Sequence, residues 1–144
     1  GDQYDALNEA RRRAAALGRL AGTEPVTGSG ITIDISGNLS ATTLLDAIQE
    51  LRDAGASAIQ ISDRNLKLRV VANTWFADSD NGVTVSGTAL TVPVTISVIG
   101  ESSVLTPALQ IPGGLVDTVG SGGGSVTITP SDDVEITAVV ALPD

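Results

Sequence analysis

The decisive stretch of the chain is residues 31–61, which read ITIDISGNLSATTLLDAIQELRDAGASAIQI. Residues 31–35 alternate apolar and polar side chains, which is the period of a half-buried strand. Residues 44–51 carry leucine and isoleucine at helical spacing, with Ser40 or Thr42 as a possible N-cap and Gly55 as the C-terminal stop. Residues 58–61 are apolar enough for a second strand. We therefore expect a right-handed crossover unit whose two strands run parallel, or nearly so, in one sheet.

The segment after this unit predicts short β-strands. Alternation resumes over residues 66–71, and residues 83–85 follow Asn81-Gly82, a dipeptide typical of hairpin turns. Residues 92–99 give the longest strand signal in the chain. Pro93 near its start indicates an edge strand or a strand entry, because proline cannot donate a main-chain hydrogen bond.

The last third of the chain predicts helix and then strand. Ser102 and Ser103 open a short helix over residues 102–109, which breaks around Pro112 and continues as a second helical turn over residues 115–119. A flexible glycine-rich loop over residues 120–125 then leads to two final strands, expected at residues 126–129 and 134–139.

This order of elements predicts an α+β fold. Without an insertion over residues 64–90, the chain reads strand, helix, strand, strand, helix, strand, which is a ferredoxin-like split β-α-β core. We expect that core to carry an inserted hairpin and an added last strand. The same order serves ligand-sensing and ring-building domains, so it predicts no function by itself.

The beginning of the chain predicts a separate element. Residues 1–22 read as an N-terminal helix and residues 23–30 as a linker, ahead of a single domain over residues 31–144. Tyr4, Leu7, Ala14, Leu17 and Ala21 lie near a heptad seam. The helix either packs on its own domain or is the end of a coiled coil through which the protein forms a homo-oligomer.

The charge distribution argues against polyanionic partners. The formal net charge is -9, and no lysine or arginine follows Arg69. A negative surface repels phosphate backbones and anionic lipids, so we expect no direct nucleic-acid binding by this domain. The basic run Arg11-Arg12-Arg13 is more typical of a solvated helix face than of an electrostatic docking site.

The residue types present exclude several chemistries. The chain has no cysteine and no histidine, which removes thiol nucleophiles, imidazole bases and the common zinc sites. Catalysis would depend on carboxylates, and the candidates for a two-carboxylate glycosidase are Asp34, Asp132, Asp133 and Glu135. We predict no enzyme activity, no catalytic residues and no cofactor, because such chemistry also needs a walled cleft.

Two further segments superficially suggest ligand sites. Residues 78–82, Asp-Ser-Asp-Asn-Gly, contain the oxygen ligands of a calcium loop, but their spacing favours a hairpin turn, so we predict no metal site. Residues 120–125 lack the lysine that follows a phosphate-binding loop, which favours a plain connection.

Trp75 and Phe76 are the most distinctive side chains of the chain and candidate partner contacts. Adjacent residues of a strand point to opposite faces, so one ring can be buried and the other exposed. The favoured interpretation places both rings over the core, and the alternative is a contact hot spot for a partner.

One family resemblance spans most of residues 1–140. Residues 49–56 (QELRDAGA) and 58–61 (AIQI) are followed by Asp63-Arg64, by residues 98–101 (VIGE) and by residues 105–114. This order resembles the YlxW-like bacterial family of unknown function (DUF 881). Its members show a helix-to-strand junction of the form "Gly-Ala-Glu-Ala-Ile".

The chain departs from the family pattern at several positions and is identified as a divergent member. Gln49 stands where the family prefers asparagine, Ser57 where it prefers an acid, and residues 62–64 where an Asn-Gly turn leading to arginine is usual. The resemblance implies no catalytic residues. It implies a protein with a transmembrane helix, a coiled coil and this domain outside the cytoplasmic membrane. It also implies that the genes of some members lie beside cell-division genes.

Two functions follow as expectations. The first is a non-catalytic extracytoplasmic interaction domain of a membrane-anchored envelope protein, linked to cell division or wall synthesis. The absence of cysteine agrees with export, and the native protein is expected to extend before Gly1 into its anchor. The second is a small-molecule sensor with its ligand at residues 55–57 or 100–103, where main-chain N–H groups could hold an anion.

Overall fold

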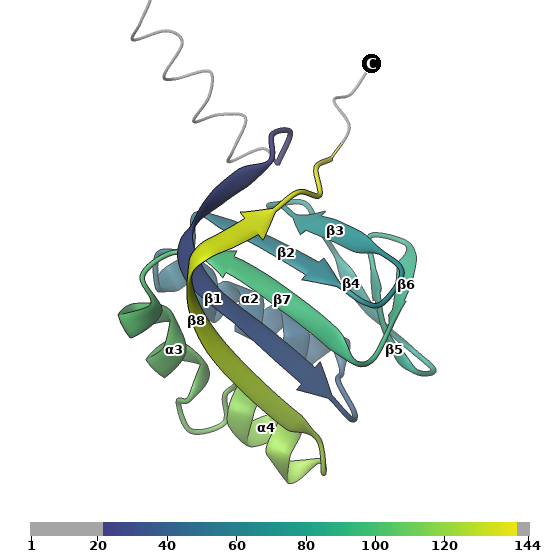
Figure 1. Ribbon diagram of the computed structural model, residues 1–144. Coiled ribbons are helices and arrows are strands. Elements are labelled where there is room, and N and C mark those ends of the chain that lie inside the picture. Colours follow the sequence, from purple (N-terminus) through teal and green to yellow (C-terminus); the bar gives the residue numbers. More distant parts are fainter. Residues whose placement is uncertain (1–21, 141–144) are drawn as a thin grey trace, which may run out of the picture.

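Five strands form one antiparallel sheet in the order β3-β2-β7-β1-β8 (Figure 1). The structure is a computed structural model that describes residues 22–140. β1 and β2 both pair antiparallel with β7, so they run in the same direction with β7 between them, as predicted for the crossover unit. The strands are β1 (Val26–Ser36), β2 (Ala58–Ser62), β3 (Lys67–Val70), β7 (Val94–Ile99) and β8 (Ser125–Ile136).

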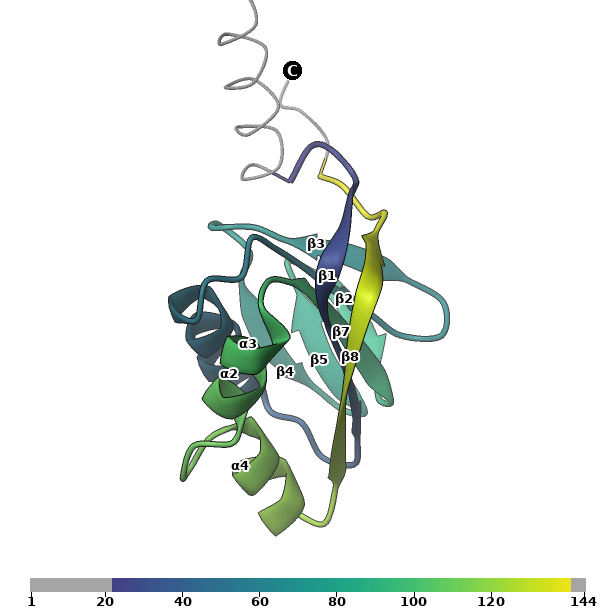
Figure 2. The ribbon, with the colours of Figure 1, turned by 60° about the vertical axis from the view of Figure 1, so that its left-hand side comes forward.

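Three helices, α2 (Ala41–Asp53), α3 (Ser102–Leu109) and α4 (Leu115–Ser121), lie on one face of this sheet (Figure 2). Ser40 caps α2 by accepting a hydrogen bond from the Thr43 N–H at 3.1 Å, and Gly55 follows the helix with a φ of 95°. The buried stripe of α2 and the isoleucines of β1 belong to one apolar cluster: Leu44, Ala47, Ile48, Leu51, Ile31, Ile33 and Ile35.

A second, three-stranded antiparallel sheet packs beside α2. It consists of β4 (Phe76–Ser79), β5 (Gly82–Val85) and β6 (Thr88–Thr91) in that order, and its inner side chains Val83, Val85 and Leu90 join the main core. The first turn is formed by Asp80 and Asn81, because Ser79 pairs with Gly82.

The predicted hairpin is therefore present, but its turn lies one residue earlier than Asn81-Gly82. The second turn, Ser86-Gly87, has φ values of 46° and 90°, as a type I′ hairpin requires. The sequence interpretation missed β4 and β6. It also missed that β3 joins the main sheet as a fifth strand.

β8 is one long, bent edge strand. The prediction of two strands over residues 126–129 and 134–139 is wrong, because pairing with β1 continues from Ser125 to Ile136 through a register shift between Gly28 and Gly30. Pro130 is tolerated inside β8 because one side of an edge strand needs no main-chain donor. β1 begins at Val26, inside the segment predicted as a linker, and Pro93 stands at the entry to the central strand β7 rather than in an edge strand.

The ends of β1 and β8 bend across the face that the helices leave open (Figure 1). There Ala58, Val134 and Ile136 form a small second cluster with Val26 and Ile99. Beside it the buried Gln60 side chain accepts hydrogen bonds from the Thr137 and Ala138 N–H groups, at 3.1 and 2.9 Å. These contacts fix the strand ends to the sheet.

Residues 120–125 do not form the predicted flexible loop. Gly120 and Ser121 end α4, and the Gly124 N–H then donates to the Val119 carbonyl at 2.9 Å. A Cβ atom on Gly124 would overlap the Ser36 carbonyl oxygen, so the glycine allows close packing there.

The helix predicted over residues 1–22 lies, except for Gly22, outside the described residues. Among residues 22–140, no helix combines the length and hydropathy needed to cross a bilayer. With three helices and two antiparallel sheets in the described part of the chain, the α+β class is confirmed.

Gly30 gives a direct test of this packing. A Cβ atom there would overlap the Val98 carbonyl oxygen of the neighbouring strand, whereas a Cβ atom on Gly120 in α4 would meet no atom within 4 Å. We predict that Gly30→Ala lowers the free energy of unfolding by about 3 kcal/mol, measured by urea denaturation. Gly120→Ala is the matched control and should raise it by about 0.5 kcal/mol. Equal stability of the two variants would contradict the proposed close approach of β1 and β7.

Candidate functional site

The structure separates Asp34 from Asp132, whereas the other two predicted carboxylate candidates, Asp133 and Glu135, lie exposed and two residues apart on β8. Asp34 pairs with Thr127 on β8 and accepts a hydrogen bond from the Thr95 hydroxyl at 2.7 Å. Asp132 lies five residues further along β8, which is about 17 Å at the rise of an extended strand. A two-carboxylate glycosidase needs its carboxyl groups within about 10 Å of each other, so Asp34 and Asp132 do not form such a pair.

The segment that resembles a calcium loop has a structural role instead. Asp78 Oδ1 accepts a hydrogen bond from the Ala41 N–H at 2.7 Å, so it satisfies a main-chain donor in the first turn of α2. Within residues 22–140, no three side chains of the metal-binding types gather at one point. Asp78 thereby joins β4 of the small sheet to the helix layer.

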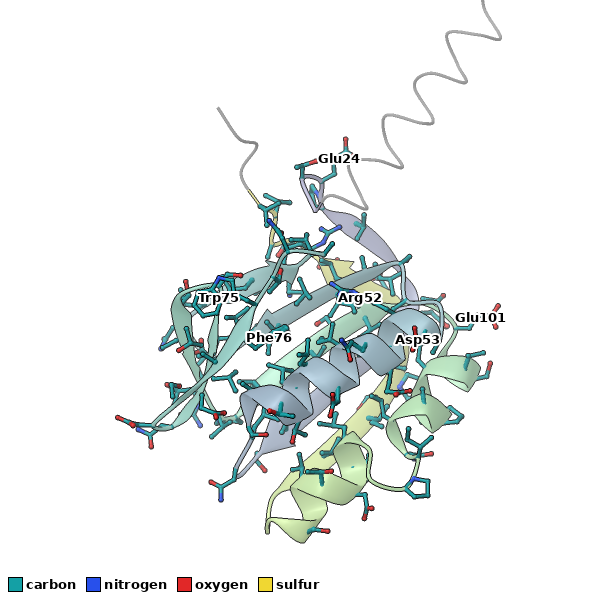
Figure 3. The ribbon with its side chains drawn as sticks, turned by 180° about the vertical axis from the view of Figure 1, so that it is seen from behind. Glu24, Arg52, Asp53, Trp75, Phe76 and Glu101 are labelled. Atoms are coloured by element: carbon teal, nitrogen blue, oxygen red, sulfur yellow. The ribbon has the colours of Figure 1, made fainter. Side chains whose placement is uncertain are left out.

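Trp75, which directly precedes β4, and Phe76, the first residue of β4, lie in different environments. Phe76 packs partly buried against the main core, whereas Trp75 is 53% exposed. In Figure 3, Phe76 lies closer to α2 than Trp75 does. The favoured sequence interpretation, with both rings over the core, is wrong for Trp75.

Hydrogen bonds hold Trp75 in place on both sides. The Ser86 N–H donates to the Trp75 carbonyl at 2.8 Å, and the Trp75 N–H donates to the Ser86 hydroxyl at 3.3 Å. On the other side, the Thr74 N–H donates to the Val71 carbonyl, and the Thr74 hydroxyl accepts from the Val71 N–H. Trp75 is therefore an exposed aromatic ring on an ordered main chain, which is the combination that partner contacts favour.

The two chain segments that lie beside Trp75 and around Ser86 carry no charged side chain. Residues 71–77 and 84–91 contain no acidic or basic side chain, in a chain of which 17% is charged. We name the exposed residues Ala72, Asn73, Trp75, Ser86 and Gly87 the Trp75 patch. Depletion of charge around an aromatic anchor is typical of the centre of a protein interface.

The Asp63 side chain joins the small sheet to the main sheet. Its Oδ1 accepts hydrogen bonds from the Asn65 and Leu66 N–H groups, both at 2.8 Å, and its Oδ2 accepts one from the Thr91 N–H at 3.1 Å. The bonds from Asn65 and Thr91 are the main causes that hold the pKa of the Asp63 carboxyl below its ordinary value. This carboxylate joins the β2–β3 turn to β6.

A cavity of about 360 Å³ lies at the junction of residues 55–57 that the sequence suggested for a ligand. The main-chain N–H groups of Gly55, Ala56 and Ser57 are used inside the fold, where they donate to the carbonyls of Arg52, Leu51 and Ile99. The polar groups offered by the cavity are side chains instead: Arg52, Ser57 and Arg69. Arg69 is 4% exposed, and its burial lowers the pKa of the guanidinium from its high ordinary value.

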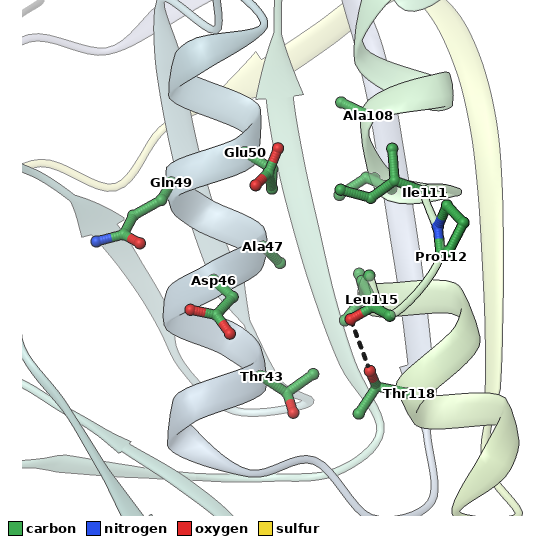
Figure 4. A pocket seen from close by; sticks show the side chains of 13 residues that line it. Thr43, Asp46, Ala47, Gln49, Glu50, Ala108, Ile111, Pro112, Leu115 and Thr118 are labelled. Atoms are coloured by element: carbon green, nitrogen blue, oxygen red, sulfur yellow. Dashed lines mark hydrogen bonds between the residues drawn. The ribbon is translucent and has the colours of Figure 1, made fainter.

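A smaller groove of about 150 Å³ separates α2 from α3 and α4 (Figure 4). Glu50 of α2 lies level with Ile111 across it, Asp46 lies level with Leu115, and the Thr118 hydroxyl donates to the Gly113 carbonyl at 3.1 Å. Its polar side chains are acidic or neutral. The second junction proposed for a ligand, residues 100–103, begins with Gly100, whose N–H donates to the Ser29 carbonyl.

Sequence reasoning missed the two arginines of the cavity. Arg52 lies in the last turn of α2 and Arg69 in β3, and only pairing of β2 with β3 brings them to one cavity. The available sequence signal was the grouping of basic residues: within residues 22–140, every lysine and arginine falls between positions 52 and 69.

Comparisons with known proteins identify relatives across nearly the whole chain. A family model described as "Bacterial protein of unknown function (DUF881)" matches residues 13–144. The UPF0749 protein Rv1825 of Mycobacterium tuberculosis is 40% identical over 137 residues, which are 93% of this chain and 47% of that protein. The UPF0749 protein YlxW of Bacillus subtilis is 28% identical over 97 residues, covering 67% of this chain and 40% of that protein.

A crystal structure of an uncharacterized conserved protein from Mycobacterium tuberculosis has a similar fold. It is 36% identical, with a TM-score of 0.88 over 92% of this chain and 94% of that one. The chain spans about half the length of the curated mycobacterial relatives it matches.

The different environments of Trp75 and Phe76 predict different effects of mutation. Phe76→Ala removes a ring packed on the core and should lower the free energy of unfolding by about 2 kcal/mol. Trp75→Ala should change it by no more than about 0.5 kcal/mol, because the ring is largely exposed. Urea denaturation measures both. A loss on Trp75→Ala as large as that on Phe76→Ala would assign Trp75 to the core.

The hydrogen bonds that the Asp63 carboxylate accepts predict that the stability of the folded domain depends on pH. Because its pKa is lower in the folded protein than the value of about 3.9 in an unfolded chain, its contribution is complete above about pH 4 and disappears as pH falls through the folded pKa. Asp63→Asn should therefore destabilise the domain at pH 7, and the difference from wild type should shrink below pH 4. The exposed Asp132→Asn serves as control. A difference in the free energy of unfolding between Asp63→Asn and wild type that stays constant from pH 7 to pH 2.5 would contradict this role of Asp63.

Proposed function

The chain belongs to the DUF881 family of bacterial proteins of unknown function, and on that premise we propose that it is a non-catalytic interaction domain. The proposed whole protein is a membrane-anchored envelope protein whose anchor lies in the part of the relatives that this chain does not span. The domain then faces the extracytoplasmic side. Its proposed partner is an envelope protein of cell division or wall synthesis.

The observation that carries this proposal is the Trp75 patch. An exposed tryptophan fixed by Ser86, between chain segments without charged side chains in an otherwise acidic domain, supports contact with a protein partner more than contact with solvent alone. Phe76, the next residue, packs partly buried against the main core. Self-association through the segment of residues 1–22 remains part of the proposal.

We further assign the main sheet to a ferredoxin-like split β-α-β core. The supporting observation is the strand order β2-β7-β1-β8, with α2 connecting β1 to β2 and the pair α3 and α4 connecting β7 to β8. In this assignment β3 and the small sheet are an insertion between β2 and β7. The Trp75 patch is then an addition to the core rather than a part of it.

The proposal predicts a Trp75-dependent interaction. Crosslinking of the full-length, natively anchored protein in membranes, followed by pull-down and mass spectrometry, should recover division or wall-synthesis proteins. Trp75→Ala should reduce that recovery at least tenfold, a loss of about 1.4 kcal/mol or more. Val104→Ala, which shortens an exposed side chain of α3, should leave it unchanged.

A variant that lacks residues 1–21 separates the two parts of the protein. Partner recovery that persists without this segment places the contact on the folded domain. Recovery of the bait alone from wild type, or an unchanged set of partners with Trp75→Ala, would contradict the proposed role of the patch.

A second candidate function is a small-molecule sensor. The specific observation in its favour is the cavity at residues 55–57, whose volume lies within the range of about 300–1,000 Å³ usual for ligand pockets.

A further inference from the structure

The groove between α2 and the pair α3 and α4 has two chemically different walls. Asp46 and Glu50 of α2 belong to one wall, and Ile111 and Leu115 belong to the other. Glu50 lies level with Ile111, and Asp46 lies level with Leu115 (Figure 4). Within residues 22–140, every basic side chain falls between positions 52 and 69, and none of them lines the groove. The groove therefore presents a negative wall opposite an apolar wall.

The two carboxylates of the negative wall have no partner in the described part of the chain. Within residues 22–140, neither Asp46 nor Glu50 forms a side-chain hydrogen bond or an ion pair. The two residues are four positions apart in α2, so their side chains are neighbours on the helix surface and repel each other. A cation placed between them would relieve this repulsion and bind both carboxylates.

The apolar wall is fixed by main-chain hydrogen bonds. The Gly114 N–H donates to the Ile111 carbonyl at 2.9 Å, and the Gly113 N–H donates to Asp117 Oδ2 at 2.9 Å. Ile111 is nevertheless 40% exposed, although it is a large apolar side chain. Because the turn that carries Ile111 is already ordered, little conformational entropy is lost when another side chain packs against it.

The size of the groove limits what can enter it. At about 30 Å³ for each water-sized group, a groove of about 150 Å³ has room for about five non-hydrogen atoms. A guanidinium and the methylene group next to it have this size. An arginine side chain also matches both walls, because its planar fork binds carboxylates and its methylene stem packs on apolar surface.

We propose that this groove receives an arginine side chain from a basic segment of a partner protein. The guanidinium lies between Asp46 and Glu50, and the methylene stem lies along Ile111. This inference rests on the proposed interaction-domain function and adds a contact that is separate from the Trp75 patch. Charge complementarity supports a basic partner, because a chain of net charge -9 attracts positively charged segments over longer distances than direct contact.

The test is a titration of the ¹⁵N-labelled full chain with the peptide acetyl-Ala-Arg-Ala-amide, followed by NMR. The amide signals of Ala47, Glu50, Ile111 and Leu115 should shift together and saturate with a single Kd in the millimolar range. The same peptide with citrulline in place of arginine keeps the shape but not the charge, and it should bind at least tenfold more weakly.

Matched variants locate the contact. Glu50→Gln removes one charge of the groove and should weaken binding of the arginine peptide at least tenfold. Glu135→Gln makes the same change at an exposed position of β8 that does not line the groove, and it should leave the Kd unchanged. Ile111→Ser should weaken binding at least threefold, whereas Val104→Ser, at an exposed position of α3 outside the groove, should not. Thermal melting of each variant confirms that it is folded.

Several outcomes would overturn the inference: no saturable shift with the arginine peptide, equal binding of the citrulline peptide, or equal effects of Glu50→Gln and Glu135→Gln. Shifts of the same signals when the protein alone is diluted would also overturn it, because they would assign the groove to the basic run at residues 11–13 of a second copy.

The titration is independent of the Trp75 patch. Trp75→Ala should bind the arginine peptide like wild type, because Trp75 does not line the groove. Failure of the titration therefore leaves the Trp75-dependent interaction untouched, and an unchanged set of partners with Trp75→Ala leaves the groove untouched.

Discussion

One apolar layer, between α2 and a single face of the five-stranded sheet, holds this domain together. Ile31, Ile33 and Ile35 on β1 share a buried cluster with Leu44, Ile48 and Leu51 of α2 and with the inward side chains of β7. The helices α3 and α4 and the small sheet extend the same layer, because Leu105, Val119 and Val83 belong to that cluster. Every peripheral element, including the one that carries Trp75, is therefore positioned by attachment to one side of the sheet.

Within residues 22–140, that arrangement leaves the other face of the sheet without a covering layer, and this part of the chain closes one end of it. The strand ends of β1 and β8 bend over that end, where Gln60 and Arg69 are buried. Burying polar side chains is costly unless they form hydrogen bonds, and these two bind main-chain groups of residues 24, 137 and 138. The Val140 N–H also donates to the Gly22 carbonyl, so both ends of the described chain leave the domain at one corner.

The elements that sequence analysis predicted well are those that local periodicity defines. β1, α2, β2 and β7 each carry a clear strand or helix pattern, and Ser40 and Gly55 mark the ends of α2. β4 and β6 were missed because their short, mixed sequences become strands only through pairing with β5. The continuity of β8 depends on a register shift opposite Gly28 and Gly30, which no pattern within β8 itself signals.

The candidate sites also divide into features that local sequence predicts and features that depend on tertiary structure. The separation of Trp75 from Phe76 follows from strand alternation, a local rule, although the sequence did not show which ring would be exposed. The cavity of Arg52 and Arg69 combines the end of a helix with a strand of the sheet, and its two arginines are seventeen positions apart. Such a site depends on tertiary structure, so composition and spacing alone did not reveal it.

The arginine cavity also limits what the net charge excludes. An overall charge of -9 repels an extended polyanion, because a nucleic acid meets many acidic side chains at once over distances of about a Debye length, near 8 Å in physiological salt. A small monoanion inside a cavity interacts mainly with the groups that line it, and here those charged groups are both arginines. The same chain can therefore repel phosphate backbones at its surface while the half-open cavity beside Arg52 and Arg69 presents no acidic side chain. The net charge bears on large partners, whereas the side chains that line a cavity determine which small molecules it attracts.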